Sequence, residues 1–378
     1  MTDTRLLIFP LDLDDAEPFI RIATALGVEV IGASSAMTGP GDRAVNHFIR
    51  LPFVTSPAFN LALRDAICQY GITTIFAPHQ GVWRHLDTLL RMSPDDYCFK
   101  LCRPDPFTAT AQLYSRHEEW AVDALHSVMP ERIGVCPVRT PLSRGSYAAL
   151  HRLFFGTPGQ CDENKLQALS DIVRLLPPGD MLEVGCLYGR SAVALGYLAG
   201  QHRIGSLICV DPWNITDIVD QGTQADVLNI ERANIDFEKI FRIYLSAVAP
   251  LGNAGYIRKT SEAAHPVYEA ARVNGQLDSP ELGSITLLPH LSLLHVDGNH
   301  RYDQVRMDVE IWSRHLAHGG WLLLDDYVWA FGDGPRLVGD ELLASPLYDS
   351  AFVDGDTLFL RRNSVVADYV NTKKSGET

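Results

Sequence analysis

Acidic residues and one histidine directly follow two apolar segments in the last third of the chain. LSLLHV (291–296) runs into DGNH, which contains Asp297 and His300, and GGWLLLDDY contains Asp325 and Asp326. Carboxylate oxygens are the ligands that hard divalent cations prefer, and a histidine can accept a proton near neutral pH. Without a cation, three neighbouring carboxylates would repel one another and raise at least one carboxyl pKa. The simpler alternative is that these residues cap turns and helices.

A loop with two glycines precedes this region. In MLEVGCLYGRSAVALG, Gly185 and Gly189 separate an apolar segment from a segment with helical character. Glycine lets the backbone approach a ligand closely, and the first turn of a helix offers unpaired N–H groups. LICVDPW then places Asp211 at a strand end, where a carboxylate can accept the two hydroxyls of a ribose. The combination indicates a nucleoside-binding fold, whereas the glycine loop alone also fits a tight turn between a strand and a helix.

Strands and helices that alternate from residue 161 must position these groups. The helix DENKLQALSDIVRLL precedes the strand MLEVG, and LICVDPW, YIRKTSEAA, LSLLHVDG and GGWLLLDDY supply the second to fifth strands, the third with its loop. Ligands of open α/β sheets meet at the carboxyl ends of the strands, so we expect the acidic residues to lie along one edge. AFVDGDTLFLRR predicts a terminal antiparallel hairpin that turns at Asp354 and Gly355.

The first hundred residues predict a smaller α/β domain with a parallel sheet. RLLIFPL, VEVIGAS and ITTIFAP read as strands, with DDAEPFIRIATALG and SPAFNLALRDAICQYG as helices between them, the second capped by Ser56 with Pro57 in its first position. No glycine follows the first strand, which argues against a dinucleotide site there. The sequence therefore predicts a domain 1–100 for recognition or assembly, a bridging segment 101–160, a second domain 161–364 and a flexible tail 365–378.

Composition excludes several classes of protein. The chain has 378 residues, 46% hydrophobic and 21% charged, which fits two globular domains. A net charge of −14 and the lack of a dense basic cluster make nucleic acid a poor partner. No apolar stretch is long enough to cross a bilayer and no signal peptide is recognisable, so we expect no membrane contact and a cytoplasmic location. The seven scattered cysteines fit reduced thiols, and a homo-oligomer is compatible with the sequence.

Residues 160–363 resemble the class I S-adenosylmethionine-dependent methyltransferases. The features that carry this resemblance are the glycine loop, Asp211 and the closing hairpin. DGNH after the fourth strand and the acidic pair after the fifth resemble one subset, the metal-dependent O-methyltransferases of macrolide sugars and their cephalosporin-hydroxylase-like relatives. Those relatives often carry Glu-Asp where this chain has Asp325-Asp326, and the shorter side chain reaches less far. In the first domain, VIGAS and IRLPF weakly resemble the small domain that precedes the ATP-grasp fold.

The resemblance implies a function. It predicts an S-adenosylmethionine-dependent, divalent-metal-assisted O-methyltransferase that acts on a hydroxyl of a small polyhydroxylated metabolite, such as a sugar or a natural product. Mg²⁺ or another divalent cation would bind Asp297, Asp325 and Asp326, and His300 would be the general base. The alternatives are a non-catalytic cofactor-binding scaffold protein and a cephalosporin-hydroxylase-like biosynthetic enzyme. The residues implied in cofactor binding are Glu183, Gly185, Tyr188, Gly189, Arg190, Ser191, Asp211, Trp213, Ser261, Glu262 and Asp297.

Some of these assignments keep a structural alternative. A histidine after a strand is commonly a structural or surface residue, and His295, inside the fourth strand, favours a core position. Tyr188 and Trp213 could wall the adenosine or simply pack. Residues 214–255 exceed one connecting helix, so their Gln-Gly-Thr-Gln loop is either a lid over the acceptor or a plain surface insertion.

Overall fold

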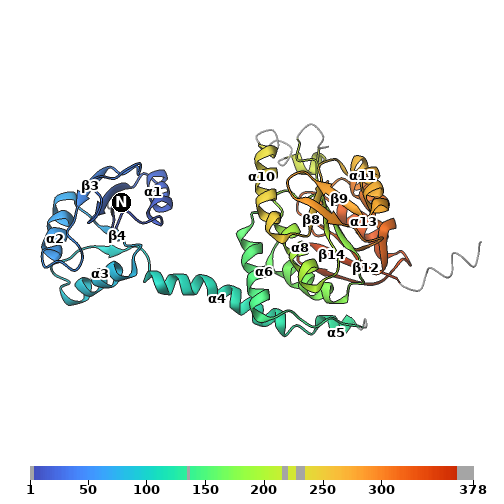
Figure 1. Cartoon of the computed structure of the whole chain (residues 1–378), viewed down its shortest axis with the longest axis horizontal. Coiled ribbons are helices and arrows are strands. Elements are labelled where there is room, and N and C mark those ends of the chain that lie inside the picture. Colours follow the sequence, from blue (N-terminus) through green and yellow to red (C-terminus); the bar gives the residue numbers. More distant parts are fainter. Residues whose placement is uncertain (1–3, 134–136, 215–219, 227–234, 364–378) are drawn as a thin grey trace, which may run out of the picture. The chain divides into compact units, whose positions relative to one another are not determined.

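The computed structural model describes residues 4–133, 137–214, 220–226 and 235–363. The chain consists of two compact units, Met1–Arg116 and His117–Thr378, and the division falls within helix α4 (Pro106–Leu125). Each unit is a mixed α/β structure, as predicted (Figure 1). No helix in the described ranges is long and apolar enough to span a bilayer.

The smaller unit is built around a five-stranded sheet in the order β3-β2-β1-β4-β5, and every strand pairs parallel to its neighbour. Its core lies between this sheet and the helices, with side chains such as Leu7, Ile31 and Leu63 fully buried. The predicted parallel sheet is thereby confirmed. Its elements are β1 (Arg5–Ile8), α1 (Ala16–Ala25), β2 (Glu29–Ser34), β3 (His47–Arg50), α2 (Phe59–Tyr70), β4 (Thr74–Phe76), α3 (Gln80–Met92) and β5 (Lys100–Leu101).

Helix α2 begins later than its sequence suggests. Ser56 and Pro57 were expected to cap and open this helix, but the first helical residue is Phe59 and Ala58 precedes it. The Ser56 hydroxyl accepts a hydrogen bond from the Ala58 N–H at 3.3 Å, so it closes a turn outside the helix. A short polar side chain can stabilise such a turn as well as a helix terminus, and here the turn is formed.

The larger unit contains a seven-stranded sheet in the order β13-β14-β12-β11-β6-β7-β8. The strands from β12 to β8 are parallel, and β14 and β13 close the sheet as the predicted antiparallel hairpin around Gly355, whose φ is +60°. The strands are β6 (Asp180–Val184), β7 (Leu207–Val210), β8 (Ala254–Ile257), β11 (Leu291–Val296), β12 (Leu316–Leu324), β13 (Tyr348–Asp354) and β14 (Thr357–Arg362), and β9 (Gln276–Ser279) with β10 (Gly283–Thr286) forms a separate hairpin.

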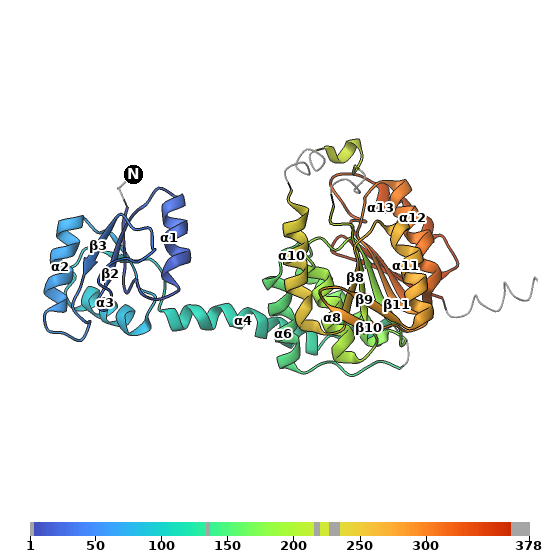
Figure 2. The same ribbon diagram turned by 45° about the horizontal axis from the view of Figure 1, so that its top comes forward.

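Helices cover both faces of this sheet (Figure 2). Alternate residues of each strand point to opposite faces, so Met181 and Leu293 pack with one helical layer while Leu182 and Leu294 pack with the other. One layer consists of α5 (Met129–Ile133), α6 (Arg144–Gly156), α7 (Glu163–Ile172), α8 (Arg190–His202) and α10 (Phe237–Val248). The other consists of α11 (Ser261–Asn274), α12 (Tyr302–Trp312) and α13 (Gly334–Leu343). Short 3-10 turns are η1 (Val173–Leu175), η2 (Thr223–Ala225), η3 (Ala249–Leu251) and η4 (Ser313–His315).

The register of the three central strands fixes where the functional residues lie. His295 of β11 is opposite Glu183 of β6 on one side and Leu323 of β12 on the other. The Asp297 N–H donates to the Val184 carbonyl at 2.8 Å, and the Asp325 N–H donates to the Val296 carbonyl at 3.0 Å. The chain therefore leaves all three strands at the same edge, as expected for parallel strands.

Candidate active site

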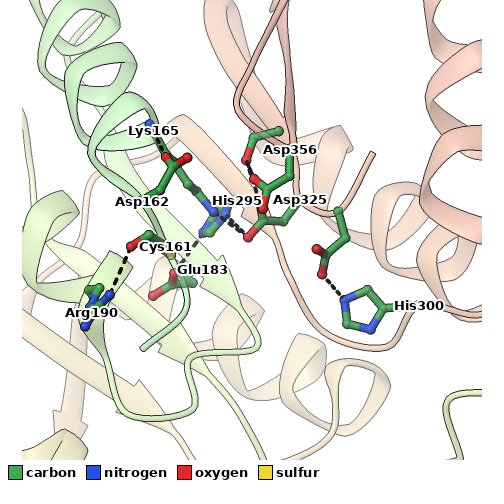
Figure 3. Close-up of polar contacts among 11 residues, drawn as sticks. Cys161, Asp162, Lys165, Glu183, Arg190, His295, His300, Asp325 and Asp356 are labelled. Carbon is green, nitrogen blue, oxygen red and sulfur yellow. Dashed lines mark hydrogen bonds and ion pairs between the residues drawn. The ribbon is translucent and has the colours of Figure 1, made fainter. Parts of the chain in front are cut away.

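A buried charged network lies where β6, β11 and β12 end (Figure 3). Glu183 and His295, 0% and 1% exposed, form a hydrogen bond of 2.8 Å between Oε1 and Nδ1. The other imidazole nitrogen of His295 lies 3.7 Å from the Asp325 carboxylate. His295 is thus a buried histidine within the sheet, in line with the core position favoured from the sequence.

Lys165 supplies the cation of this network. It belongs to α7, whose first turn is capped by Asp162, and its side chain is 1% exposed. The Lys165 ammonium forms an ion pair with Oδ2 of Asp325, and the Thr357 hydroxyl donates to Oδ1 of the same carboxylate. Although burial alone would lower it, the Asp325 carboxylate raises the pKa of Lys165 well above its usual range. Burial would raise the pKa of Asp325, but Lys165 and His295 lower it well below the ordinary value, so both partners are charged.

The second carboxylate of the acidic pair points elsewhere. Asp326 has a φ of +54°, so the backbone turns sharply after Asp325 and the two adjacent side chains face different partners. Oδ2 of Asp326 lies 2.5 Å from Nε2 of His300. The structure thereby divides the three predicted metal ligands: donor atoms of Asp297, His300 and Asp326 lie within 4.8 Å of one another, while Asp297 and Asp325 form another such group with Cys161.

The His300 ring is fixed by one contact on its face and another at Nδ1. The imidazole stacks on Trp329 with 4.2 Å between ring centroids. Oε1 of Gln221 accepts a hydrogen bond from the His300 backbone N–H at 2.9 Å and lies 2.9 Å from Nδ1. Because that oxygen already accepts a backbone proton, we assign it as the acceptor for Nδ1 as well, which places a proton on Nδ1. Nε2 is then the only ring nitrogen that can bind a proton or a cation.

Asp297 lies between the two carboxylates. Burial and the neighbouring Asp325 carboxylate raise the pKa of Asp297 well above its usual range, even though Lys165 acts in the opposite direction. Its backbone also limits the residue opposite, because a Cβ at Gly185 would stand 2.0 Å from the Asp297 carbonyl oxygen, and Gly185 has a φ of +82°. Only glycine fits at this position, for reasons of both space and backbone conformation.

Asp211 ties the glycine loop to the next strand. Its Oδ2 accepts the N–H groups of Cys186 at 2.9 Å and Leu187 at 3.1 Å, and its Oδ1 accepts the Trp213 N–H at 2.8 Å. A carboxylate offers about four acceptor positions, so three of them are occupied by the backbone. Burial raises the pKa of Asp211 even so. Asp211 therefore shapes the loop whether or not it also contacts a ribose.

Two other predicted cofactor residues, Arg190 and Trp213, donate side-chain hydrogen bonds to backbone carbonyls of the protein. The Arg190 guanidinium donates to the carbonyls of Thr157 at 2.8 Å and Cys161 at 3.0 Å, which attaches the segment before α7 to α8. The Trp213 indole is 1% exposed, donates to the Leu187 carbonyl at 2.8 Å and packs 4.5 Å from the Tyr244 ring. Trp213 is a core residue beneath the loop, the structural alternative considered above.

The remaining predicted cofactor residues lie along the same strand ends. Ser261 opens α11, where its hydroxyl accepts the Trp312 indole N–H at 2.7 Å, and Glu262 beside it is exposed. Tyr188 and Gly189 lie in the loop and Ser191 in the first turn of α8, with Gly189 at a φ of +91°. One oxygen of Glu183, Oε2, is buried and has no hydrogen-bond partner within the described ranges.

Sequence reasoning missed Lys165 and Gln221. Lys165 is part of an amphipathic helix, where a lysine is normally a solvated residue, and its partner Asp325 is 160 residues away. Gln221 belongs to the Gln-Gly-Thr-Gln loop that was considered as a lid, and it contacts His300 directly. Its neighbour Asp220 pairs with Arg301 at 3.3 Å. Residues 215–219 and 227–234 of the predicted insertion 214–255 lie outside the described residues.

Part of this chain is similar to known proteins. Residues 182–327 match a family described as a methyltransferase domain, and no curated protein sequence matches the chain. Among solved structures, the O-methyltransferase NovP is 13% identical, with 66% of this chain and 99% of NovP aligned and a TM-score of 0.40. TomG from Streptomyces achromogenes, an O-methyltransferase involved in tomaymycin synthesis, is 15% identical over 60% of this chain and 93% of its own, with a TM-score of 0.38. These structural likenesses are distant.

Proposed function

We propose that this chain, whose residues 182–327 match a methyltransferase domain, is a class I S-adenosylmethionine-dependent enzyme that methylates a hydroxyl of a small polyhydroxylated molecule with the help of a divalent cation. One contact carries the proposal. Nδ1 of His300 is fixed as a donor by Gln221, and Nε2 faces the Asp326 carboxylate at 2.5 Å. A lone pair and a carboxylate oxygen repel each other at this distance, so a proton must lie between Nε2 and Asp326, and Nε2 can therefore hold a proton at this point.

His300 suits the part of general base. A hydroxyl must lose its proton to attack the methyl group, and Nε2 is the ring atom that can take it. Stacking on Trp329 and the Gln221 contact fix the ring, so little rotational freedom is lost when substrate binds. Gln221 at Nδ1 orients the ring, and the charge of the Asp326 carboxylate beside Nε2 stabilises the imidazolium that forms.

The carboxylates of Asp297 and Asp326 suit a hard divalent cation. Their oxygens lie in one group with His300, and a divalent cation there would offset the burial and the Asp325 repulsion that together raise the pKa of Asp297. When bound, such a cation lowers the pKa of a coordinated hydroxyl. Asp325 is less suited to the ligand role predicted for it, because Lys165 and Thr357 already occupy both of its oxygens. A chelating vicinal diol or catechol is the acceptor that this arrangement favours.

The cofactor fits the edge between β6 and β7. The first-turn N–H groups of α8 have no acceptor within the helix, and the backbone can be approached closely at Gly185 and Gly189. The orphaned Glu183 Oε2 is a buried acceptor at the same strand end. Asp211 has room for about one further hydrogen bond, so we propose that it accepts a single ribose hydroxyl. S-adenosylmethionine supplies the electrophilic methyl group.

The test measures formation of S-adenosylhomocysteine with panels of sugars, vicinal diols, catechols and hydroxylated natural products. We expect turnover that is lost after exhaustive EDTA treatment and restored by Mg²⁺. His300→Ala should lower kcat by roughly 10²- to 10⁴-fold and leave S-adenosylmethionine affinity unchanged. His318→Ala is the matched control, because His318 is an exposed histidine whose ring lies 2.9 Å from the Asn363 carbonyl, away from the strand ends.

Each outcome separates one part of the proposal. Full turnover after EDTA treatment would refute the role of the cation. An unchanged rate in His300→Ala would refute the role of His300 as the base. Tight S-adenosylmethionine binding with no product from any acceptor favours the scaffold alternative. For the predicted domain 1–100, which lies within the smaller unit, we propose acceptor recognition or assembly. Its removal should then abolish turnover or assembly and leave cofactor affinity intact.

A further inference from the structure

A second group of potential metal ligands lies between helices α11 and α12, on one face of the larger sheet. His265 and Glu269 are four residues apart on α11, so their side chains lie on the same face of that helix. His315 ends the turn η4 that follows α12. The two helices run side by side in the larger unit (Figure 2).

The spacing of the donor atoms matches a tetrahedral cation site. Nε2 of His265 lies 3.0 Å from Nε2 of His315, and Nε2 of His315 lies 3.2 Å from Oε1 of Glu269. All three atoms lie within 4.8 Å of one another. Zinc binds such atoms at about 2.0–2.1 Å, and tetrahedral geometry then separates two ligands by roughly 3.3 Å. Two of the three separations are close to that value.

Hydrogen bonding alone leaves this group unsatisfied. If His265 donates to Nε2 of His315, that nitrogen is unprotonated and its lone pair faces the Glu269 carboxylate. If His315 instead donates to Nε2 of His265, Oε1 of Glu269 receives no proton from either ring. Oε1 of Glu269 is shielded from solvent and has no well-aligned hydrogen bond within the described part of the chain. A cation at the centre satisfies all three atoms together.

The side chains are already fixed in this arrangement. Nη2 of Arg272 holds the other Glu269 oxygen at 3.1 Å, which directs Oε1 inward. The His265 ring packs 5.4 Å from the Trp312 ring, and the His315 ring packs 5.2 Å from the Tyr268 ring. Partners that orient metal ligands in this way are a regular feature of metal sites.

We propose that His265, Glu269 and His315 bind a transition-metal cation of the zinc type, with water in the fourth position. Imidazole nitrogen is a preferred ligand of Zn²⁺, Cu²⁺ and Ni²⁺, whereas Mg²⁺ prefers oxygen, so this site selects a different cation from Asp297 and Asp326. A bound cation links α11 to the α12–η4 segment. Because α11 opens with Ser261 beside the strand ends, the link fixes the helix that borders the active site. The inference does not depend on the proposed function.

The experiment titrates the full chain with Zn²⁺ by calorimetry in excess Mg²⁺, which occupies oxygen sites. We expect His315→Ala and Glu269→Gln to lose one equivalent of Zn²⁺ or to weaken its binding roughly 100-fold, while His318→Ala behaves as wild type. Zn²⁺ should also raise the Tm of wild type and of His318→Ala but not that of His315→Ala. Glu269→Gln preserves side-chain shape, so its folded state can be verified by circular dichroism.

Co²⁺ provides a readout of geometry. Substitution at this site should give the intense visible absorption of tetrahedral cobalt, and the His265→Ala variant should lose it. Failure of wild type to bind Zn²⁺ would overturn the proposal. So would Zn²⁺ binding of equal affinity and stoichiometry in His265→Ala and His315→Ala, since the cation would then lie at another group, such as the exposed Cys98 or Cys102.

Discussion

Replacement of Lys165 by methionine should destabilise the larger unit strongly at neutral pH. Methionine keeps most of the apolar stem and removes the ammonium that is ion-paired with Asp325, leaving only the His295 imidazole, 3.7 Å away, beside that carboxylate. Lys165 and Asp325 have side chains 1% and 8% exposed, so no water replaces the lost charge. Breaking a buried pair by removing one partner costs about 3–5 kcal/mol. We expect a loss of this size in the free energy of unfolding at pH 7.5.

The pH dependence of that loss is the more specific signature. In the wild type the pKa of Asp325 is held below its unfolded value, so the carboxylate stabilises the fold above an unfolded pKa of about 4. In the variant, burial raises the folded pKa instead, so the fold binds a proton more readily than the unfolded chain. Stability of the variant therefore falls as pH rises from about 4 through the new folded pKa. The difference from wild type should be large at pH 7.5 and small near pH 4.5.

Urea denaturation at both pH values measures this difference. The matched control is Lys239→Met, an exposed lysine on α10, which should change stability by less than about 0.5 kcal/mol. The double variant Lys165→Met/Asp325→Asn should recover a large part of the loss, because the uncompensated charge is gone. A loss below about 1 kcal/mol at pH 7.5, or one equally large at pH 4.5, would refute the reasoning.

Three further predictions follow from particular contacts. Gly185→Ala should abolish S-adenosylmethionine binding and lower Tm, because its Cβ would meet the Asp297 carbonyl at 2.0 Å. The control Gly252→Ala is also at positive φ but has nothing within 4 Å, so it should lower the free energy of unfolding by only about 1 kcal/mol. Equal effects of the two variants in thermal melts would contradict this prediction. Asp211→Asn should weaken S-adenosylmethionine binding and destabilise the loop by about 1–3 kcal/mol, since an amide N–H would replace one acceptor; calorimetry with unchanged affinity and Tm would exclude the role. Burial raises the pKa of Asp308 to about 7, so the folded wild type binds a proton more readily than the unfolded chain. The wild type should therefore lose up to about 4 kcal/mol of stability between pH 4 and pH 8 relative to Asp308→Asn. Parallel profiles of stability against pH for the two proteins would disprove this prediction.

The sequence predicted the fold well because the signals for it are local. Apolar segments such as MLEVG and LSLLHV, separated by helical segments, determine a parallel sheet, and the Asp354-Gly355 turn determines the closing hairpin. Helix boundaries were less accurate: α2 begins after the predicted cap at Ser56, because the same serine can close a turn. The third-strand segment YIRKTSEAA was read as strand and loop, but Ser261 already begins α11.

The candidate site was predictable only in part. The position of Asp297 at a strand end follows from the order of the strands, but the partners of the acidic pair do not. Residues adjacent in sequence were expected to act together, yet the positive φ of Asp326 separates it from Asp325. Arg190 and Trp213 were assigned to the cofactor because they follow the glycine loop and the second strand, whereas their side chains donate to backbone carbonyls of the protein. Such pairings depend on tertiary distance, which residue spacing does not encode.

The partners of Asp325 also bear on which part of this chain can fold by itself. The family match covers residues 182–327, but Lys165 precedes that range and Thr357 follows it. A fragment cut at the family limits would keep a buried carboxylate and lose both the cation and the hydroxyl that satisfy it. It would also lose β14, which pairs along β12. The autonomous unit is therefore larger than the segment that the family shares, and the helix before the glycine loop is as much a part of it as the loop.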